Sequence, residues 1–324
     1  MTAKKRGVLI VNLGSPDKAS ILAVRRFLKQ FLSDPRVVNL PRLLWWAILN
    51  FFILPFRPFK SVKVYKEIWT EAGSPLIVLT ESLVAKLNRF YKKDSTISIK
   101  AAMSYGQPAL TSILREFKQE KVDQLIVIPV YPQYSSTTTA SVFDAVTREL
   151  QQWRYIPELS FVSDYHQSPY YIKAIAESVE KAWRKKPKNK LLLMSFHGLP
   201  AQLTKWGDPY FDQCHVSAKL IAEALELKPD EWKIVFQSRF GRAKWLQPYC
   251  VEALMALPER NFNKIDIICP GFSVDCLETL EEINITNQAI FLDAGGDDYC
   301  YIAALNDTRG NLELMSDLIE SRSN

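Results

Sequence analysis

The sequence has few of the residues that build disulfide or metal-cluster frameworks. It has no C-x-x-C pair, and its five cysteines are odd in number and confined to the second half of the chain, at Cys214, Cys250, Cys269, Cys276 and Cys300. A disulfide scaffold and a zinc ribbon are therefore excluded in their simplest forms. Reduced thiols are expected, and they indicate a cytoplasmic protein.

Several motifs that mark enzyme classes are also absent. The chain contains no G-x-G-x-x-G, P-loop, H-E-x-x-H or G-x-S-x-G pattern. Dinucleotide, nucleoside triphosphate, zinc protease and α/β-hydrolase functions thus lose their simplest support. The 41 Lys and Arg exceed the 35 Asp and Glu by a net charge of +6, with no basic block of five residues. We expect no nucleic-acid partner, and the charge suits an anionic ligand or a lipid surface.

No apolar run is long enough to cross a membrane. The most apolar window, residues 43–56, includes Asn50 and Pro55, whereas a spanning helix needs about 20 apolar residues. Its aromatic residues, and the basic residues on both sides of it, suit a lip at a membrane interface; a buried helix is the alternative. We therefore expect a cytoplasmic protein, with residues 43–56 as the candidate peripheral contact to the inner membrane face.

The composition is that of a globular α/β protein. The 324 residues are 48% hydrophobic and 23% charged, which is enough chain to bury a core in two domains. Short β-branched runs alternate with amphipathic stretches, a pattern typical of parallel strands joined by helices. The predicted strands are 7–12, 97–104, 123–130, 158–163, 190–196, 232–237, 264–269 and 288–292. The predicted helices are 18–32, 75–92, 107–120, 136–152, 168–185, 211–226, 243–257, 275–284 and 309–321.

The two halves of the chain resemble each other weakly. Residues 122–138 are similar to 265–280, each an apolar strand followed by proline and a polar loop. We predict two domains, 1–165 and 166–324, with the last helix packing back on the N-terminal half. Ligands bind beyond the carboxyl ends of parallel strands, so the strand-end loops should form a cleft between the halves. A chance likeness of two strand–helix units is the alternative.

His197 follows the very apolar run Leu191–Met194 and lies at the carboxyl end of a predicted strand. A histidine in this position is well placed for proton transfer or metal binding. The alternative is a structural histidine that is hydrogen-bonded into the turn after it. His166 and His215 fall in helix-start or helix contexts and look like surface residues.

A second candidate site is the acidic stretch that follows the strand at 264–269. Asp275, Glu278 and Glu282 are spaced to share one face of an α-helix, whereas Glu281 points elsewhere. In a cleft, burial and mutual repulsion would raise their pKa values, so that the column could pass protons near neutral pH. A solvated acidic helix face is the alternative. At another strand end, Gln237, Ser238 and Trp245 suit a flat anionic ligand or form an ordinary surface loop.

Seven segments together resemble the ferrochelatase family, in order and over nearly the whole chain. They are VNLGSP at 11–16, GSPL at 73–76, YPQYSSTTT at 131–139, SFHGLP at 195–200, GDPY at 207–210, QSRFG with WLQP at 237–248, and PGFSVDCLETLEE at 270–282. The resemblance implies two Rossmann-like domains and insertion of ferrous iron into a porphyrin, the substrates, in haem synthesis. It also implies that His197 takes a pyrrole proton or meets the metal and that Glu278 faces it, while Asp275 and Glu282 lead protons or metal along a path.

The resemblance further implies where the porphyrin binds. Residues 43–56 match the lip of the family, and the other expected porphyrin contacts are Leu13, Arg57, Tyr65, Ser74, Tyr134, Gln237, Ser238 and Trp245. Leu13 stands where the coproporphyrin-using branch tends to carry tyrosine, which favours protoporphyrin IX. The alternatives are a coproporphyrin ferrochelatase, a cobalt or nickel chelatase of another tetrapyrrole, and a non-catalytic porphyrin carrier.

Some family members hold an iron–sulfur cluster, and this sequence departs from them. No cysteine follows Cys300, and the cysteines before it lack the close grouping that a cluster needs. We predict no cluster and no permanently bound cofactor. Cys276 stands where some relatives carry a histidine, so carboxylates are the only strong proton carriers expected on that helix.

Overall fold

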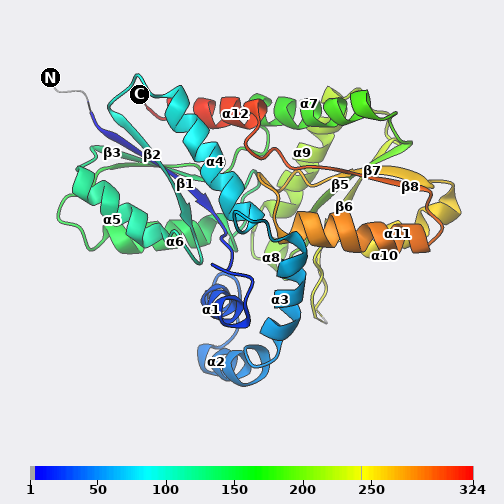
Figure 1. Cartoon of the computed structure of the whole chain (residues 1–324), viewed down its shortest axis with the longest axis horizontal. Coiled ribbons are helices and arrows are strands. Elements are labelled where there is room, and N and C mark those ends of the chain that lie inside the picture. The colour runs from blue at the N-terminus through cyan, green and yellow to red at the C-terminus, as the bar shows by residue number, and fades with distance from the viewer. Residues whose placement is uncertain (1–3, 242, 324) are drawn as a thin grey trace. The chain divides into compact units, whose positions relative to one another are not determined.

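The computed structural model describes residues 4–241 and 243–323, which form two compact units (Figure 1). The described residues of the first unit are 4–131, 135–164 and 315–323, and those of the second are 132–134 and 165–314. Each unit contains one four-stranded parallel sheet with helices on both faces. The predicted α/β fold with two Rossmann-like domains is confirmed.

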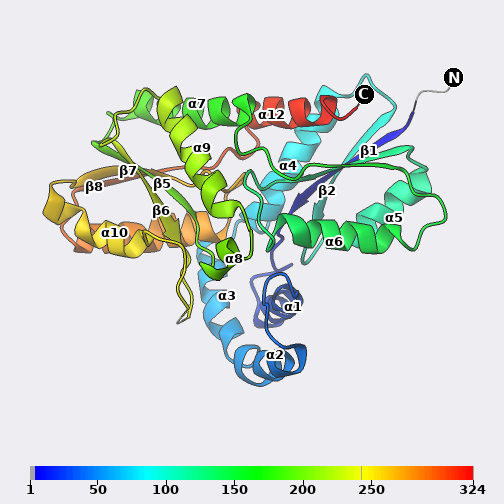
Figure 2. The ribbon, with the colours of Figure 1, turned by 180° about the vertical axis from the view of Figure 1, so that it is seen from behind.

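The sheet of the first unit has the strand order β2-β1-β3-β4. Its strands are β1 (Arg6–Asn12), β2 (Ile97–Met103), β3 (Gln124–Pro129) and β4 (Glu158–Phe161). Helices α5 (Leu110–Glu120) and α6 (Thr139–Leu150) cover one face and α4 (Pro75–Phe90) the other (Figures 1 and 2). The chain leaving β1 builds a separate lobe from α1 (Ile21–Leu32), α2 (Arg42–Ile48), η1 (Leu49–Ile53) and α3 (Arg57–Ile68).

The sheet of the second unit repeats this topology in the order β6-β5-β7-β8. Its strands are β5 (Leu191–His197), β6 (Trp232–Gln237), β7 (Lys264–Ile268) and β8 (Asp298–Ile302). Helices α7 (Pro169–Lys185) and α9 (Tyr210–Ala224) lie on one face, with the short α8 (Gln202–Lys205) between β5 and α9. The other face carries α10 (Cys250–Ala256), η2 (Pro258–Arg260), η3 (Glu278–Asn287) and α11 (Gln288–Asp293).

The last helix, α12 (Arg309–Glu320), begins in the second unit and ends in the first. Its C-terminal part and the residues after it are tied to the first unit by two hydrogen bonds. Tyr91 donates its hydroxyl to Glu320 at 3.2 Å, and Gln124 donates its amide to the carbonyl of Arg322 at 2.7 Å.

The structure corrects several details of the sequence-based prediction. The predicted strand 288–292 is helix α11, and the eighth strand is β8, ten residues further on. A short run of four apolar residues fits a strand and a buried helical turn equally well, and here Phe291 packs into the core from a helix. The predicted α-helix 275–284 is the π-helix η3, which starts at Glu278. His166, expected at the surface, is buried.

Candidate functional site

The carboxyl ends of β5 and β6 place two predicted site residues side by side. His197 is the last residue of β5 and is in register with Gln237, the last residue of β6. A Cβ atom at Gly198 would lie 2.5 Å from the Gln237 carbonyl oxygen and 3.2 Å from the Trp245 ring. Only glycine allows this approach, so the turn after His197 requires the glycine of the SFHGLP segment.

The hydrogen bond of His197 indicates which ring nitrogen can accept a proton. Its Nδ1 lies 2.6 Å from the carbonyl oxygen of Gly198. Because a carbonyl oxygen only accepts, Nδ1 carries the proton and the lone pair of the neutral ring is on Nε2. The side chain is half-buried, with its ring centroid 6.4 Å from that of Phe272. Nε2 is therefore the atom through which His197 can take up a proton or bind a metal.

Glu282, on helix η3, is held by the strand-end residues of β6. Its carboxylate accepts from the Ser238 backbone N–H at 2.6 Å, the Ser238 hydroxyl at 2.5 Å and the Gln237 amide at 3.4 Å. Burial raises the pKa of Glu282, against the lowering effects of the Ser238 hydrogen bonds and of His197, while the charge of Glu278 raises it further. His197, Glu278 and Glu282 thus act on one another electrostatically within one site.

Gln237 and Ser238, predicted to contact the porphyrin, both bond to helix η3. The Gln237 amide donates to the carbonyl oxygen of Glu278 at 2.9 Å, and its own oxygen accepts from the Ser195 hydroxyl at 2.8 Å. Ser238 has a φ of 62°, in the left-handed region that non-glycine residues rarely adopt. This backbone conformation occurs where Ser238 gives two donors to one carboxylate, and such strain is typical of functional sites.

Asp275 does not lie in a helical column with the two glutamates. Helix η3 begins at Glu278, and Asp275 lies three residues earlier, in the loop after β7. Glu281 accepts instead from Thr286 at 2.7 Å, away from the Glu282 partners. The predicted α-helical face of Asp275, Glu278 and Glu282 is therefore wrong, although Glu278 and Glu282 share a helix. Among the described residues, no three His, Cys, Asp or Glu side chains form a group that could hold a metal ion.

Two further predicted contacts lie in the second unit. Trp245 is half-buried and forms an antiparallel bridge with Pro200, so its indole covers the turn after His197. Tyr134 is also half-buried, and its backbone N–H donates to Gln213 at 2.7 Å. The sequence analysis missed Ser195, which fixes the Gln237 amide; its position two residues before His197 on the same face of β5 was the available signal.

The remaining predicted contacts lie in the first unit. Leu13 follows β1 and donates its N–H to Asn12 at 2.8 Å, and Ser74 is buried immediately before α4. Arg57 and Tyr65 are both on α3. Desolvation lowers the pKa of Arg57, and the neighbouring Tyr65 raises it in part. Arg57 is nevertheless among the exposed residues of α3, where an anion can reach it.

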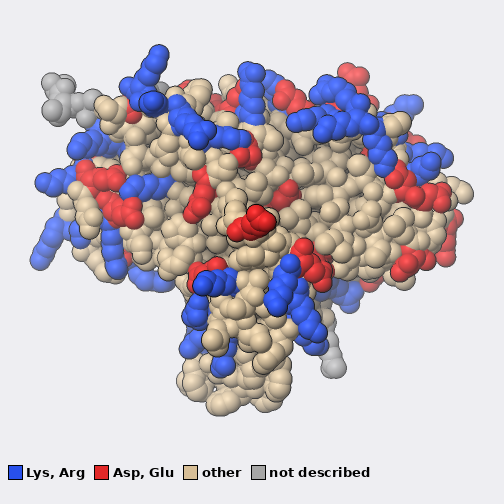
Figure 3. Space-filling model, in the orientation of Figure 1, with Lys and Arg blue, Asp and Glu red and all other residues tan. Residues whose placement is uncertain are grey.

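The apolar segment 43–56 forms the end of the lobe and exposes one apolar face. Trp45 is buried and donates its indole N–H to the carbonyl oxygen of Leu32 at 2.6 Å. The exposed apolar residues of the segment include Leu43, Leu44, Trp46, Phe51, Phe52 and Phe56. On the face drawn in Figure 3 the tip of the lobe shows no charged side chains, and Lys and Arg side chains lie above it, nearer the rest of the molecule. No helix in the described ranges has the length and apolar character to span a membrane.

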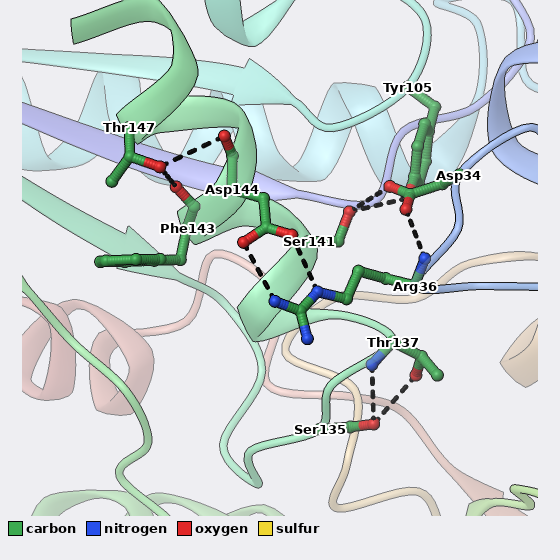
Figure 4. Close-up of polar contacts among 9 residues, drawn as sticks. All are labelled: Asp34, Arg36, Tyr105, Ser135, Thr137, Ser141, Phe143, Asp144 and Thr147. Atoms are coloured by element: carbon green, nitrogen blue, oxygen red, sulfur yellow. Dashed lines mark hydrogen bonds and ion pairs between the residues drawn. The ribbon is translucent and has the colours of Figure 1, made fainter. Parts of the chain in front are cut away.

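A polar network attaches the base of this lobe to the sheet of the first unit (Figure 4). The Asp34 carboxylate accepts from the hydroxyls of Tyr105 at 2.8 Å and Ser141 at 2.5 Å. Arg36 forms two hydrogen bonds with Asp144, at 2.8 and 3.1 Å. Because Ser141 and Asp144 are on α6, the segment leading into α2 is fixed to a rigid helix.

Comparison with known proteins identifies the family. A family model described as Ferrochelatase matches residues 5–323. The chain belongs to the ferrochelatase family. It is 48% identical to a ferrochelatase of Methylococcus capsulatus, with 98% of this chain and 97% of that protein covered. It is 47% identical to ferrochelatase 2 of Shewanella oneidensis, with 98% of this chain and 97% of that protein covered.

Solved structures agree with the fold. SirB from Bacillus subtilis with Fe3+ superposes with a TM-score of 0.58 at 10% identity, covering 98% of this chain and 95% of that one. DR2241 from Deinococcus radiodurans, described as similar to chelatases, gives a TM-score of 0.57 at 11% identity and covers 98% of this chain and 55% of that one. At such low identity the likeness concerns the fold alone.

Proposed function

We propose that this ferrochelatase-family enzyme inserts ferrous iron into protoporphyrin IX. Family membership makes the chain a metal chelatase of haem synthesis that places iron in a porphyrin. The choice of protoporphyrin over coproporphyrin is supported by the apolar Leu13, which stands where, by the family resemblance, the coproporphyrin-using branch tends to carry tyrosine. The observation that carries the chemistry is the pairing of the His197 Nε2 acceptor with a glutamate of raised pKa.

Metal insertion releases two protons from the pyrrole nitrogens, so the site needs two acceptors. We propose that Nε2 of His197 takes one proton, since Nδ1 is already protonated and fixed by Gly198. The carboxylates Glu278 and Glu282 take the other, an uptake that the raised pKa of Glu282 favours, and then pass it to solvent. His197 and Glu278 are the groups proposed to meet the incoming ferrous ion, because imidazole and carboxylate both bind divalent iron.

The porphyrin is proposed to bind through apolar contacts to its ring and polar contacts to its propionates. Arg57, which is exposed and near Tyr65, suits a propionate carboxylate. Ser74, Leu13, Tyr134 and Trp245 are the further proposed porphyrin contacts. Gln237 and Ser238 are proposed to act on the porphyrin through Glu278 and Glu282, to which they bond.

The exposed apolar end of the lobe is proposed to receive the porphyrin or to rest on a membrane surface. Its exposed aromatic side chains and the basic residues behind them support a peripheral contact with anionic lipid. This would place a cytoplasmic enzyme at the inner face of the membrane. The proposal includes no nucleic-acid partner and no permanently bound cofactor. It also includes no iron–sulfur cluster, because the cysteines are spread along the sequence.

The test is an anaerobic assay of the purified chain with ferrous iron and either protoporphyrin IX or coproporphyrin III, followed by absorbance. Faster conversion of protoporphyrin IX to haem is the expected result. Faster conversion of coproporphyrin III would overturn the substrate assignment. A higher rate with cobalt or nickel than with iron would overturn the assignment of iron as the metal. Tight porphyrin binding without insertion of iron, cobalt or nickel would indicate a porphyrin carrier.

A further inference from the structure

We infer that Asp275 is a positioning residue, which fixes the start of the helix that bears Glu278 and Glu282. The inference rests on the proposed function in so far as Glu278 meets the metal. It assigns to Asp275 a role different from the place in a proton path that the sequence resemblance implied. The argument is built from the contacts of this buried carboxylate.

Asp275 is 6% exposed and accepts four hydrogen bonds. One carboxylate oxygen accepts from the Tyr301 hydroxyl at 2.5 Å, the Thr279 hydroxyl at 3.1 Å and the Ala304 N–H at 3.2 Å. The other accepts from the Asn306 amide at 2.7 Å. The Asp275 N–H also donates to the Asn306 side-chain oxygen at 2.8 Å. Asp275 therefore joins the loop after β7 to the loop after β8.

The same contacts reach the reacting groups through the first turn of η3. Thr279, which donates to Asp275, directly follows Glu278 and also accepts from the Cys276 N–H at 2.9 Å. On the opposite side, the Gln237 amide holds the Glu278 carbonyl oxygen at 2.9 Å. The backbone around Glu278 is thus held by two contacts, the Gln237 amide on the Glu278 carbonyl oxygen and Asp275 on the Thr279 hydroxyl. Loss of Asp275 would remove the second contact. Small displacements of a reacting group cost large factors in rate.

The test compares Asp275→Asn, Tyr301→Phe and the double variant, with Tyr91→Phe as the matched control. Tyr91 also gives its hydroxyl to a carboxylate, that of Glu320, but in the first unit. We expect each single variant to lower kcat about tenfold and to raise the KM for Fe²⁺, with the KM for protoporphyrin IX unchanged. The double variant should be no slower than Asp275→Asn, because both changes remove the same support. Tyr91→Phe should behave as wild type.

Three results would overturn the inference. Normal kinetics for Tyr301→Phe with loss of activity in Asp275→Asn would make the carboxylate itself the necessary group. Lower melting temperatures with unchanged kcat and KM in both variants would leave only a role in stability. Multiplying losses in the double variant would show two independent roles. Fe²⁺ affinity, measured without porphyrin, distinguishes the inference from the proposed function. A wild type that binds Fe²⁺ and forms no haem contradicts the proposed function only. Equal Fe²⁺ affinity in the wild type and both single variants contradicts the inference.

Discussion

His197 combines a fixed tautomer with a strand-end position, so its removal should affect chemistry more than binding. We expect His197→Ala to lower kcat by about 10²–10⁴-fold, the range for loss of a general base, while protoporphyrin still binds. His215→Ala is a matched control, because His215 also has its Nδ1 on a backbone carbonyl, that of Phe211 at 2.9 Å. Steady-state kinetics with fluorescence titration of the porphyrin is the measurement. More than a tenth of wild-type turnover in His197→Ala would contradict the assignment.

The glutamates of η3 should differ in importance according to their contacts. Glu278→Gln should lower kcat steeply and Glu282→Gln less, because Glu278 is the carboxylate proposed to face the metal. Glu281→Gln should have almost no effect, since Glu281 bonds only to Thr286 among the contacts described for it. Rates of haem formation under saturating substrates measure the order. Equal losses at 278 and 281 would show that contact with this site does not decide the effect.

Ser238 offers a test of pH dependence. Burial raises the pKa of Glu282, and the two Ser238 hydrogen bonds lower it. Loss of the Ser238 hydroxyl should therefore raise that pKa further. Activity that needs ionised Glu282 falls as the pH drops through this pKa. Ser238→Gly, which also suits a φ of 62°, should therefore move the acidic limb of the pH–rate profile to higher pH. A limb at the wild-type position would assign that titration to His197.

At the scale of elements, the lobe of α1, α2 and α3 contains two adjacent tryptophans that differ in exposure. Trp46 is exposed, whereas Trp45 is buried and bonded to Leu32. Trp46→Ser combined with Phe51→Ser should weaken co-sedimentation with anionic vesicles or raise the KM for protoporphyrin, with the melting temperature unchanged. Trp45→Ser should lower the melting temperature instead, because it leaves a cavity. A destabilised Trp46/Phe51 variant would mean that these side chains support the fold of the lobe.

The packing of α5 on α6 includes an ion pair that makes stability pH-dependent. Arg115 donates twice to the buried Glu149, at 3.1 Å each, and chiefly these bonds hold the pKa of Glu149 below its usual value. Such a carboxylate stabilises the fold above its unfolded pKa, and this contribution disappears as the pH falls through the lower folded pKa. Arg115→Ala should lower the free energy of unfolding at pH 7, because Glu149 loses both hydrogen bonds from Arg115. In denaturant titrations the difference from wild type should shrink as the pH falls through the folded pKa of Glu149; a constant difference would contradict this explanation.

For the whole molecule, the sequence predicted the sheets better than the site. Strands such as Gln124–Pro129 are short, rich in β-branched residues and bounded by turns, so they can be predicted from local sequence. Strand β8 was missed because its sequence, DYCYI, has no clear alternation, whereas the neighbouring QAIFL run is more apolar. His197 was found because its strand begins with four apolar residues, Leu191–Met194, and ends at it.

Features that depend on distant partners could not be predicted. Asp275 was assigned to a helical column because three acidic residues matched a local period. Its actual partners, Tyr301 and Asn306, lie 26 and 31 residues further along the chain. The π-helical geometry of η3 likewise has no local signal in the residue pattern, and it depends on side chains such as Tyr299, which donates to the Ile283 carbonyl at 2.6 Å. Tertiary contacts of this kind override local periodicity.

The shared strand order of the two sheets gives the scaffold two equivalent positions for a reacting group. Asn12 ends the central strand β1 just as His197 ends the central strand β5. The Asn12 amide donates to the Thr80 hydroxyl at 3.0 Å, and an amide cannot take up a proton near neutral pH. The two equivalent strand ends therefore differ in chemistry although their sheets have the same strand order. A histidine placed at position 12 would lie beside Thr80, whereas His197 lies at a site with Glu282, so copying the residue would not copy the chemistry.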